Sequence, residues 1–501
     1  MTIAQIIGLI IVVVLSALGG FFIVKKSKNH NLIKWAGLFF FLSIALTWIF
    51  SAGSYNGAEI SDYGMIRVGL TDIPKVIFNA IYLAGDKILF LLTLGCFYAV
   101  LTKVAGYKKL VNNIAETFKG KEILFTLFVS LIFVALSTLL NQTFIALIFV
   151  PFIVSIILSM GLDKITAFSV TFGSILIGLI GITYGSDGLY WLNQYLKQPI
   201  ESVDLNITTG IVYRLLILAI SYLLFNFFNI LHIKKTLNDK KVDERNVDPF
   251  KVEKVEKKAN AWPIAIILGL IFVISILGYI SWSGTFGIEV FNKFHTWLME
   301  IKIGDFAVFS SLLGSSAKNA AFGLWDFYHI NTILIIVSII VALIGRVKFN
   351  DYISACGEGI KKIGKPVILY ILVYMIFIVT YMSPFVPTIN NIIYGSINKF
   401  NPFLVSLISL ISNVFETDLG YTGFIVGQFF TAKFVEYRML IQHIFSTMYG
   451  FVQLCIPTSA ILLIGLSYLN IDYKTWMKYI WIFVLSILVI LLVLTTILAY
   501  I

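Results

Sequence analysis

The stretch Ser446–Met477 reads STMYGFVQLCIPTSAILLIGLSYLNIDYKTWM and lies at bilayer depth, between two apolar runs. Pro457, in its middle, cannot donate a backbone hydrogen bond, and its ring clashes with the preceding helical turn. Unpaired backbone in hydrocarbon costs several kcal/mol, so an interrupted helix persists only where it lines a cavity within the protein. We therefore interpret this stretch as a broken transmembrane helix that faces a solute site.

A second interrupted span, Ile165–Leu196, occupies the first half of the chain, and its break reads GITYGSDG over residues 181–188. Broken helices at corresponding places in two halves of a chain are typical of the solute site of a secondary transporter. The two breaks together predict a transporter whose solute lies between them.

Composition agrees with a membrane protein, since the 501 residues are 59% hydrophobic and 13% charged, with a mean hydropathy of +0.94. Soluble domains carry about 25% charged residues. The formal charge of +11 fits Lys and Arg gathered in cytoplasmic loops, and we expect no nucleic-acid partner. The three cysteines have no paired spacing and the five histidines are scattered, which predicts no disulfide, metal site or cofactor.

Two pairs of short apolar runs each surround a polar tip: 123–136 and 144–158 in the first half, and 403–411 and 421–430 in the second. Each run is shorter than the roughly 20 residues of a spanning helix. Both pairs are therefore predicted to be re-entrant hairpins with their tips near the midplane. For the first pair, two tilted spans joined by an outer loop are the alternative.

The distribution of basic residues orients these elements. If Ile6–Val24 is a retained first span with its N-terminus outside, 26 of the 37 Lys and Arg residues fall in cytoplasmic segments, and Arg214 falls within a span. This bias supports the orientation. One hairpin then enters from inside and the other from outside, as in inverted-topology repeats.

The predicted fold is an all-α polytopic membrane protein with about ten spans and two re-entrant hairpins, in two inverted-topology repeats with broken helices. Residues 103–122 and 346–365 are predicted to be basic cytoplasmic loops, and the role of 283–329 is left open. The predicted segments are an N-terminal two-span region with an outer segment (1–85), a first repeat (86–231, with hairpin 122–160 and broken helix 165–196), a basic cytoplasmic linker (232–261), connecting spans (262–365) and a second repeat (366–501, with hairpin 402–431 and broken helix 438–471).

A broken helix directs free N–H groups and the positive end of its dipole at the gap, which suits a carboxylate. Hydroxyl and amide side chains at the breaks and tips are therefore the predicted solute ligands. They are Ser137, Asn141, Thr143, Thr183, Ser186, Ser412, Asn413, Gln453, Thr458 and Ser459. The same residue types also bridge helices structurally, and that alternative stays open for each of them.

Three carboxylates fall at or near membrane depth, where ionisable groups are costly and usually functional. Asp187 and Glu416 are predicted to bind a cationic group of the solute, or to carry a coupling ion, either Na⁺ or a proton. Asp418 is interpreted as a solvated side chain at a shallower tip.

Three pairs of motifs carry a family resemblance: PTSAIL at 457–462 with DYKTW at 472–476, GLTDI at 69–73 leading into DKILF at 86–90, and GLDK at 161–164 before a Gly-rich span. In them, and over most of its length from Gly69 on, the chain resembles the YfcC-like, anaerobic C4-dicarboxylate carrier family of the ion transporter superfamily, which includes arginine–ornithine exchangers. The resemblance implies an elevator-like homodimeric carrier of amino acids or carboxylates. The chain departs from the family at the second tip, where Glu416 and Asp418 stand in place of small residues.

These features predict a secondary active transporter in the bilayer of the bacterial cytoplasmic membrane, working by exchange or ion coupling. Neither tip contains a Lys or Arg to pair with a second carboxylate, which favours a small amino acid such as arginine or ornithine as the substrate. A C4-dicarboxylate or other small carboxylate is the alternative, and an ion or solute channel is the alternative from another class. The sequence has no phosphate-binding Gly-Lys-Ser/Thr loop and no nucleophile paired with a base, so neither ATP-driven transport nor an enzyme is expected.

Overall fold

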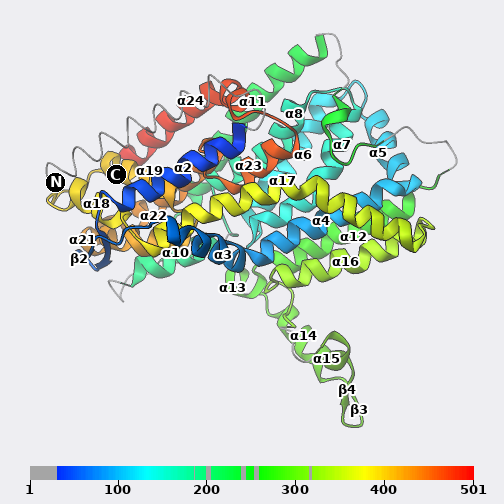
Figure 1. Ribbon diagram of the computed structural model, residues 1–501, viewed down its shortest axis with the longest axis horizontal. Coiled ribbons are helices and arrows are strands. Elements are labelled where there is room, and N and C mark those ends of the chain that lie inside the picture. Colours follow the sequence, from blue (N-terminus) through cyan, green and yellow to red (C-terminus); the bar gives the residue numbers. More distant parts are fainter. Residues whose placement is uncertain are drawn as a thin grey trace.

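The computed structural model describes residues 31–185, 187–198, 205–238, 244–252, 259–314 and 319–500. The predicted first span Ile6–Val24 and the predicted ligand Ser186 lie outside these residues. Apart from two small β-hairpins, the regular structure of the described chain is helical (Figure 1). Within it, eight helices are long and apolar enough to cross a membrane, and four shorter apolar helices accompany them. The prediction of an all-α polytopic membrane protein is confirmed.

The elements follow one another in three groups. Up to the linker they are α2 (Asn31–Thr47), β1 (Ala52–Asn56), β2 (Glu59–Gly64), η1 (Leu70–Asp72), α3 (Ile73–Leu83), α4 (Gly85–Lys103), α5 (Ala105–Thr117), α6 (Glu122–Leu139), η2 (Thr143–Phe149), α7 (Val150–Ser159), α8 (Lys164–Phe168), the π-helix η3 (Ser169–Gly173), α9 (Ser174–Ile180), α10 (Asp187–Lys197) and α11 (Ile211–Asn238). The middle group is η4 (Arg245–Val247), α12 (Trp262–Tyr279), α13 (Trp282–Phe286), α14 (Val290–Glu300), β3 (Lys302–Ile303), β4 (Phe306–Ala307), α15 (Val308–Leu313) and α16 (Phe327–Ile344). The last group is α17 (Phe349–Met382), α18 (Val386–Tyr394), α19 (Pro402–Phe415), α20 (Leu419–Thr422), the π-helix η5 (Gly423–Gly427), α21 (Gln428–Lys433), η6 (Val435–Tyr437), α22 (Arg438–Cys455), α23 (Ala460–Tyr468) and α24 (Tyr473–Tyr500).

Both halves of the chain contain a helical hairpin followed by an interrupted helix. In the first half, α6 and the η2–α7 arm surround a tip at residues 140–142, and α9 and α10 flank a break whose described residues are 181–185. In the second half, α19 and the α20–η5–α21 arm surround a tip at 416–418, and α22 and α23 flank the break at 456–459. The order of elements around Pro457 and around the first break is therefore the same.

Two segments predicted to be basic loops are helical instead. Residues 103–122 contain α5, in which Tyr107, Val111 and Ala115 are buried at every fourth position. This apolar stripe makes α5 an amphipathic helix. The lysines on its other faces made the segment look like a basic loop in the sequence. Residues 349–365 of the other segment belong to α17, a 34-residue helix that continues through Pro366.

The second tip is also shorter than the predicted tip Ser412–Asp418, because α19 continues to Phe415. The Ser412 hydroxyl donates to the carbonyl of Ile408 at 2.8 Å, and the Asn413 amide donates to the carbonyl of Ser409 at 2.8 Å. Bonds from a side chain to the preceding helical turn satisfy polar groups inside a helix. These two residues therefore belong to the helix and not to the tip.

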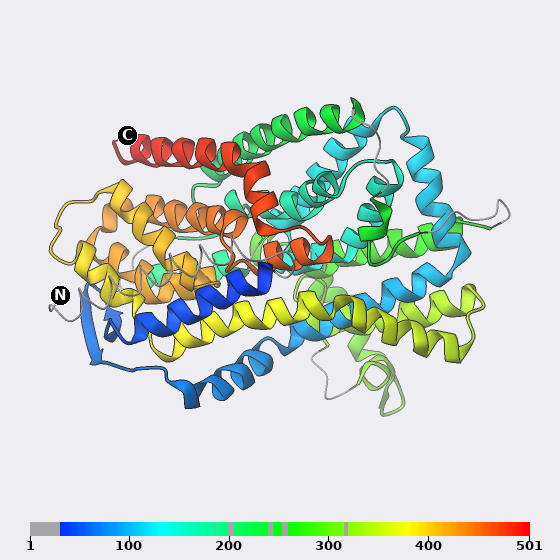
Figure 2. The ribbon, with the colours of Figure 1, turned by 45° about the horizontal axis from the view of Figure 1, so that its top comes forward.

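Helix α17 is the central support of the molecule. It packs along α4 and also contacts α2, α3 and α23, while α16 packs on the other side of α4. Figures 1 and 2 show it in yellow, running along much of the long axis of the molecule. The interrupted helices pack against each other next to it, with α9 in contact with α6, α11 and α22, and α22 in contact with α19.

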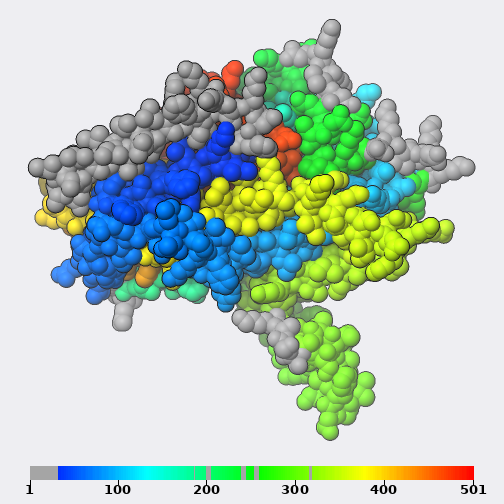
Figure 3. Space-filling view, in the orientation of Figure 1, coloured from blue at the N-terminus to red at the C-terminus, as the bar shows by residue number. Residues whose placement is uncertain are grey.

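The region that the sequence left open forms an arm, which contains α13, α14, β3, β4 and α15. It projects from the body between α12 and α16 (Figures 1 and 3). The returning chain is attached at the base of the arm, where the backbone N–H groups of Gly323 and Trp325 both donate to the carbonyl of Gly278, at 3.0 and 3.3 Å. The arm is thus an insertion between two spans.

Candidate substrate-binding cavity

A cavity of about 200 Å³ lies where both hairpin tips and both helix breaks meet. The first tip and the start of the η2–α7 arm contribute residues 141–144, and the start of α10 contributes Asp187 and Gly188. The second tip and the start of α20 contribute 417–419, and the second broken helix contributes Tyr449, Gln453, Ala460 and Ile461. Helices α4 and α17 complete the lining with Lys87, Tyr370, Val373, Tyr374 and Phe377. In the structure, both hairpin tips and both interrupted helices thus contribute residues to one cavity.

Four helical segments begin at this cavity. Thr143 is the first residue of the η2–α7 arm, Asp187 of α10, Leu419 of the α20–η5–α21 arm and Ala460 of α23. The first N–H groups of a helix have no partner within the helix, and they carry the positive end of the helix dipole. The ends at Thr143 and Ala460 favour an anionic solute, whereas Asp187 and Asp418 place a carboxylate at the other two.

Lys87 brings a formal positive charge to the cavity. It is in the first turn of α4, with its ammonium 3.7 Å from Asp86 Oδ2 and 5.2 Å from the centre of the Phe327 ring. Among the described residues that line the cavity, it is the one Lys or Arg. A signal for it was present in the sequence, because Asp86 and Lys87 are a charged pair at the head of an apolar run.

Two carboxylates also line the cavity, Asp187 and Asp418. Asp418 caps α20, since its Oδ1 accepts a hydrogen bond from the backbone N–H of Tyr421 at 2.8 Å. Asp187 is exposed, and its charge is attracted by Lys87 and repelled by Asp418. Asp418, interpreted from the sequence as solvated, therefore faces the same chamber as Asp187.

The first tip and the first break are held together by hydrogen bonds between residues about 45 positions apart. Thr138 Oγ1 accepts from the backbone N–H of Thr183 at 2.8 Å and lies 2.9 Å from its hydroxyl. The backbone N–H of Gly185 donates to the carbonyl of Thr138, and that of Asp187 to the carbonyl of Asn141, both at 2.9 Å. Backbone that leaves a helix inside a membrane needs such partners, so Thr183 stabilises the break.

The break also uses a buried arginine. Arg214 of α11 is completely buried, and its Nη1 donates to the carbonyls of Ile182 and Thr183, both at 3.1 Å. Its Nη2 donates to the carbonyls of Ile207 and Thr209. A cation at the C-terminal end of α9 also complements the helix dipole. The one basic residue that the sequence placed within a span therefore stabilises the first break.

Aromatic side chains stabilise the second break. The Trp476 indole donates to the carbonyl of Leu454 at 3.2 Å, and the Tyr473 hydroxyl donates to that of Cys455, so the end of α22 is capped from α24. On the other side of the break, Ser459 Oγ accepts from the backbone N–H of Leu462 at 3.3 Å and caps α23. Ser459 is thus part of the helix start that faces the cavity.

Glu416 is buried beside the cavity and does not line it. Its Oε2 accepts a hydrogen bond from Thr380 Oγ1 at 3.1 Å. Its Oε1 has no hydrogen-bond partner within the part of the chain that the structure describes, and no ion pair with Lys, Arg or His is found there. The next two residues, Thr417 and Asp418, do line the cavity.

The predicted ligands therefore divide into two groups. The residues that line the cavity are Asn141, Thr143, Asp187 and Gln453. The described residues that lie outside its lining are Ser137, Thr183, Ser412, Asn413, Glu416, Thr458 and Ser459. Among these, Ser137 links α6 to α9, because its hydroxyl donates to the carbonyl of Ile175 at 2.7 Å.

Besides Glu416, two predicted residues have polar atoms without a hydrogen-bond partner. Gln453 Nε2 and Thr458 Oγ1 are buried without a hydrogen-bond partner among the described residues. Buried polar groups normally have partners, so a donor in the cavity lining, as on Gln453, is suited to a solute acceptor.

Sequence reasoning missed the aromatic wall of the cavity. Tyr370, Tyr374 and Phe377 project from one face of α17, and Tyr449 faces them from α22. Their spacing of four and three residues is the signal for a shared helix face, although aromatic residues are common in any span. The described residues contain no cluster of three or more His, Cys, Asp or Glu side chains that could hold a metal ion.

Comparison with known proteins adds one family and two distant structures. The family model DcuC, the C4-dicarboxylate anaerobic carrier, matches residues 6–417, a range that includes Lys87 and ends inside the second tip. No curated protein matches the chain. The YdaH transporter of Alcanivorax borkumensis is similar at 12% identity and a TM-score of 0.36, over 93% of this chain and 97% of that one. Neisseria gonorrhoeae MtrF, described as illuminating a class of antimetabolite efflux pumps, is similar at 13% identity and a TM-score of 0.35, over 94% of this chain and 95% of that one.

Proposed function

Because the chain belongs to the anaerobic C4-dicarboxylate carrier family, we propose that this multi-pass membrane transporter carries C4-dicarboxylates across the bacterial cytoplasmic membrane. The family match over residues 6–417 is the observation that carries the proposal. This match favours a C4-dicarboxylate, the alternative substrate class, over a basic amino acid, for which the comparisons offer no support.

The lining of the cavity supports an anionic substrate. The preference for an amino acid depended on the lack of Lys and Arg in either tip, but Lys87 reaches the cavity from α4. One carboxylate of the substrate would pair with the Lys87 ammonium. The other would accept hydrogen bonds from the helix starts at Thr143 and Ala460, where free N–H groups and the dipole favour an anion.

The charges that line the cavity also support coupling to a cation. Asp187 and Asp418 face a single ammonium, that of Lys87, so a substrate with two negative charges would enter a chamber with an excess of carboxylate. Like charges at close range repel, and more strongly in a poorly solvated site. Entry of a cation or proton together with the dicarboxylate removes this repulsion.

Glu416 supports a proton as the coupling ion. A buried carboxylate without a counter-charge is costly, and a proton on Glu416 removes that charge while the Thr380 hydroxyl still donates to Oε2. The groups that act on Glu416 are Thr380 of α17 and the Asp418 carboxylate in the same tip, with the Tyr421 phenol of α20 nearby. In this proposal Glu416 accepts the proton from one side of the membrane and releases it to the other.

The matching order of elements supports two repeats that work as a pair. We propose residues 86–231 and 366–501 as inverted repeats, each contributing one tip and one break to the cavity. Solutes of inverted-repeat carriers bind at the repeat interface near the midplane. Movement of the two hairpins and the two interrupted helices against α4 and α17 would expose the cavity to either side in turn.

A second substrate class is favoured by one observation, which is the pair of carboxylates at Asp187 and Asp418. An amino acid would place its ammonium group between them and its carboxylate at Lys87. The two classes separate in one experiment, in which purified protein in liposomes is tested with labelled succinate, fumarate, arginine and ornithine. We expect saturable uptake and counter-flow of the dicarboxylates alone. Uptake of the amino acids alone would overturn the substrate proposal, and conduction without counter-flow would indicate a channel.

A further inference from the structure

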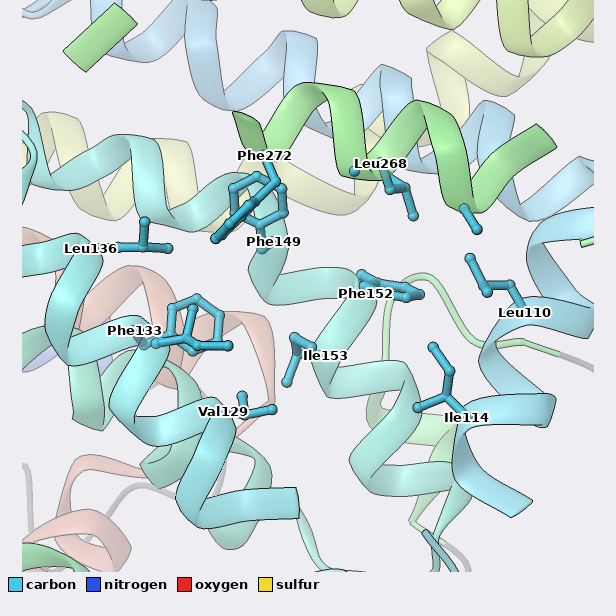
Figure 4. A pocket seen from close by; sticks show the side chains of 13 residues that line it. Leu110, Ile114, Val129, Phe133, Leu136, Phe149, Phe152, Ile153, Leu268 and Phe272 are labelled. Carbon is cyan, nitrogen blue, oxygen red and sulfur yellow. The ribbon is translucent and has the colours of Figure 1, made fainter. Parts of the chain in front are cut away.

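A second cavity, of about 300 Å³, lies between α5, α6, the η2–α7 arm and α12, well separated in its lining from the substrate-binding cavity. Figure 4 shows Leu110, Phe133, Phe152 and Phe272 converging on it from these four elements. All the side chains that line it are apolar, and Gly269 of α12 completes the wall. We call this space the apolar crevice.

The helices α6 and α12, which line the apolar crevice, also form part of the lipid-facing surface of the protein. On α6, the residues that line the crevice alternate with Phe128 and Leu131, which are 62% and 50% exposed. On α12, they alternate with Ile266 and Leu270, which are 57% and 54% exposed. Because the chain is a multi-pass membrane protein, these large exposed apolar side chains face the acyl chains of lipid.

The crevice has the size and chemistry of a site for one acyl chain. Water in a cavity needs two to four polar partners, which this lining does not provide, and an apolar cavity of about 150 Å³ stays dry and takes up benzene. On that scale, the apolar crevice has room for roughly a dozen carbon atoms. Wall atoms without contacts lose dispersion energy, so a chain from the surrounding lipid would fill it.

Charge in the same segment as the crevice lining selects the kind of lipid. The residues of α5 that line the crevice, Leu110 and Ile114, belong to the segment 105–121, which contains four lysines and one acidic residue: Lys108, Lys109, Lys119, Lys121 and Glu116. Basic clusters beside a membrane attract anionic headgroups. We propose that an anionic phospholipid binds here, with one acyl chain in the apolar crevice and its phosphate against the lysines of α5.

This lipid would pack against the first hairpin, whose tip lines the substrate-binding cavity. Leu136 of α6 and Phe149 of the η2–α7 arm line the apolar crevice, whereas Asn141 and Phe144, between them in sequence, line the substrate-binding cavity. The acyl chain therefore lies between the two arms of the first hairpin and fixes their separation. The proposal needs only a membrane-embedded protein and does not depend on which substrate is carried.

The proposal is tested with a variant whose larger side chain occupies the crevice. A Cβ on Gly269 meets no atom within 4 Å, so Gly269→Leu places four carbons in the crevice without a clash at the first of them. Gly37→Leu on α2 is the matched control, because a Cβ there also meets nothing within 4 Å and it does not line the crevice. Retained lipid is counted by native mass spectrometry after titration of delipidated protein with phosphatidylglycerol or phosphatidylcholine.

We expect the unchanged protein and Gly37→Leu to retain one phosphatidylglycerol in preference to phosphatidylcholine, and Gly269→Leu to lose that preference. The double variant Lys108→Gln/Lys109→Gln, which leaves the crevice intact, should weaken phosphatidylglycerol binding about thirtyfold. It also serves as the test if Gly269→Leu does not fold. Equal retention of both lipids by the unchanged protein, or unchanged binding in the lysine variant, would overturn the proposal.

Discussion

Gly450 of α22 lies directly against the carbonyl of Leu179 in α9, where a Cβ built on Gly450 would come within 2.2 Å of the oxygen. The neighbouring atoms are backbone on both sides, so neither helix can yield by changing a rotamer. This contact brings Gln453, one turn further along α22, and Leu179 itself to the wall of the substrate-binding cavity. The absence of a side chain at Gly450 is therefore a condition for the two interrupted helices to meet.

Gly450→Ala should separate these helices and destabilise the protein by about 1–3 kcal/mol, the usual consequence of overpacking. We expect a lower melting temperature in detergent and a loss of substrate uptake. Gly364→Ala is the control, because a Cβ at Gly364 in α17 meets nothing within 4 Å. A Gly450→Ala protein with unchanged melting and transport would contradict the close crossing.

Lys87→Gln should weaken transport of a dicarboxylate by removing its counter-charge. Hydrogen bonds to charged groups contribute about 1.5–3 kcal/mol, so kcat/KM for succinate should fall roughly tenfold to hundredfold. Lys75→Gln, on the exposed surface of α3, should leave transport unchanged. Initial rates of uptake into proteoliposomes provide the measurement, and equal values for Lys87→Gln and the unchanged protein would exclude Lys87 from the site.

Glu416→Gln fixes the second tip in a neutral form and so separates exchange from coupling. A glutamine keeps the hydrogen bond from Thr380 but cannot release a proton. We expect counter-flow of labelled succinate to persist, and uptake driven by a pH gradient to disappear. Glu436→Gln, at an exposed position, should retain both activities. If Glu416→Gln still accumulates succinate in response to a pH gradient, the proton is carried elsewhere.

The linker contains a carboxylate whose titration should control docking of the segment 244–252. Asp248 accepts hydrogen bonds from Ser155 at 2.6 Å, from Tyr468 at 3.2 Å and from the backbone N–H of Phe250 at 2.9 Å. Phe250 is fully buried. Burial raises the pKa of Asp248 from 3.8 to about 6, although these hydrogen bonds act in the opposite direction.

Because the pKa of Asp248 is higher in the docked state, protonation strengthens docking. This contribution is fully present below pH 4 and is lost as the pH rises through about 6. The docking equilibrium should therefore be about tenfold more favourable at pH 5 than at pH 7.5. Hydrogen exchange of the amides of 244–252 measures it. Asp248→Asn should remove the pH dependence and Asp351→Asn, on the exposed start of α17, should retain it.

The sequence predicted the parts of the site that are marked by a break in a pattern. Pro457 and the glycines of 181–188 interrupt apolar runs, and polar residues separate the short arms, so tips and breaks could be located without coordinates. Residues that enter the cavity from an uninterrupted helix carry no such mark. Lys87 can therefore be recognised as a cavity residue only when the position of α4 beside the tips is known.

The hydroxyl residues show a second limit. Thr183 and Ser412 are residue types expected of solute ligands, yet Thr183 bonds to the end of α6 and Ser412 bonds to its own helix. Both uses satisfy polar groups away from water, and sequence does not distinguish them. The helix within the predicted loop 103–122 was missed for a related reason, because the lysines of α5 stand on the faces that its apolar stripe leaves free.

Asn141 joins the arm between α12 and α16 to the substrate-binding cavity. Asn141, which lines the cavity, donates its backbone N–H to the carbonyl of Tyr279 at 2.8 Å, and its side-chain amide lies 3.5 Å from the carbonyl of Gly323. Both partners belong to the base of the arm. An antibody fragment bound to α14, added to increase the mass of the protein for imaging, would therefore also affect the residues that line the chamber. We expect such a fragment to inhibit transport.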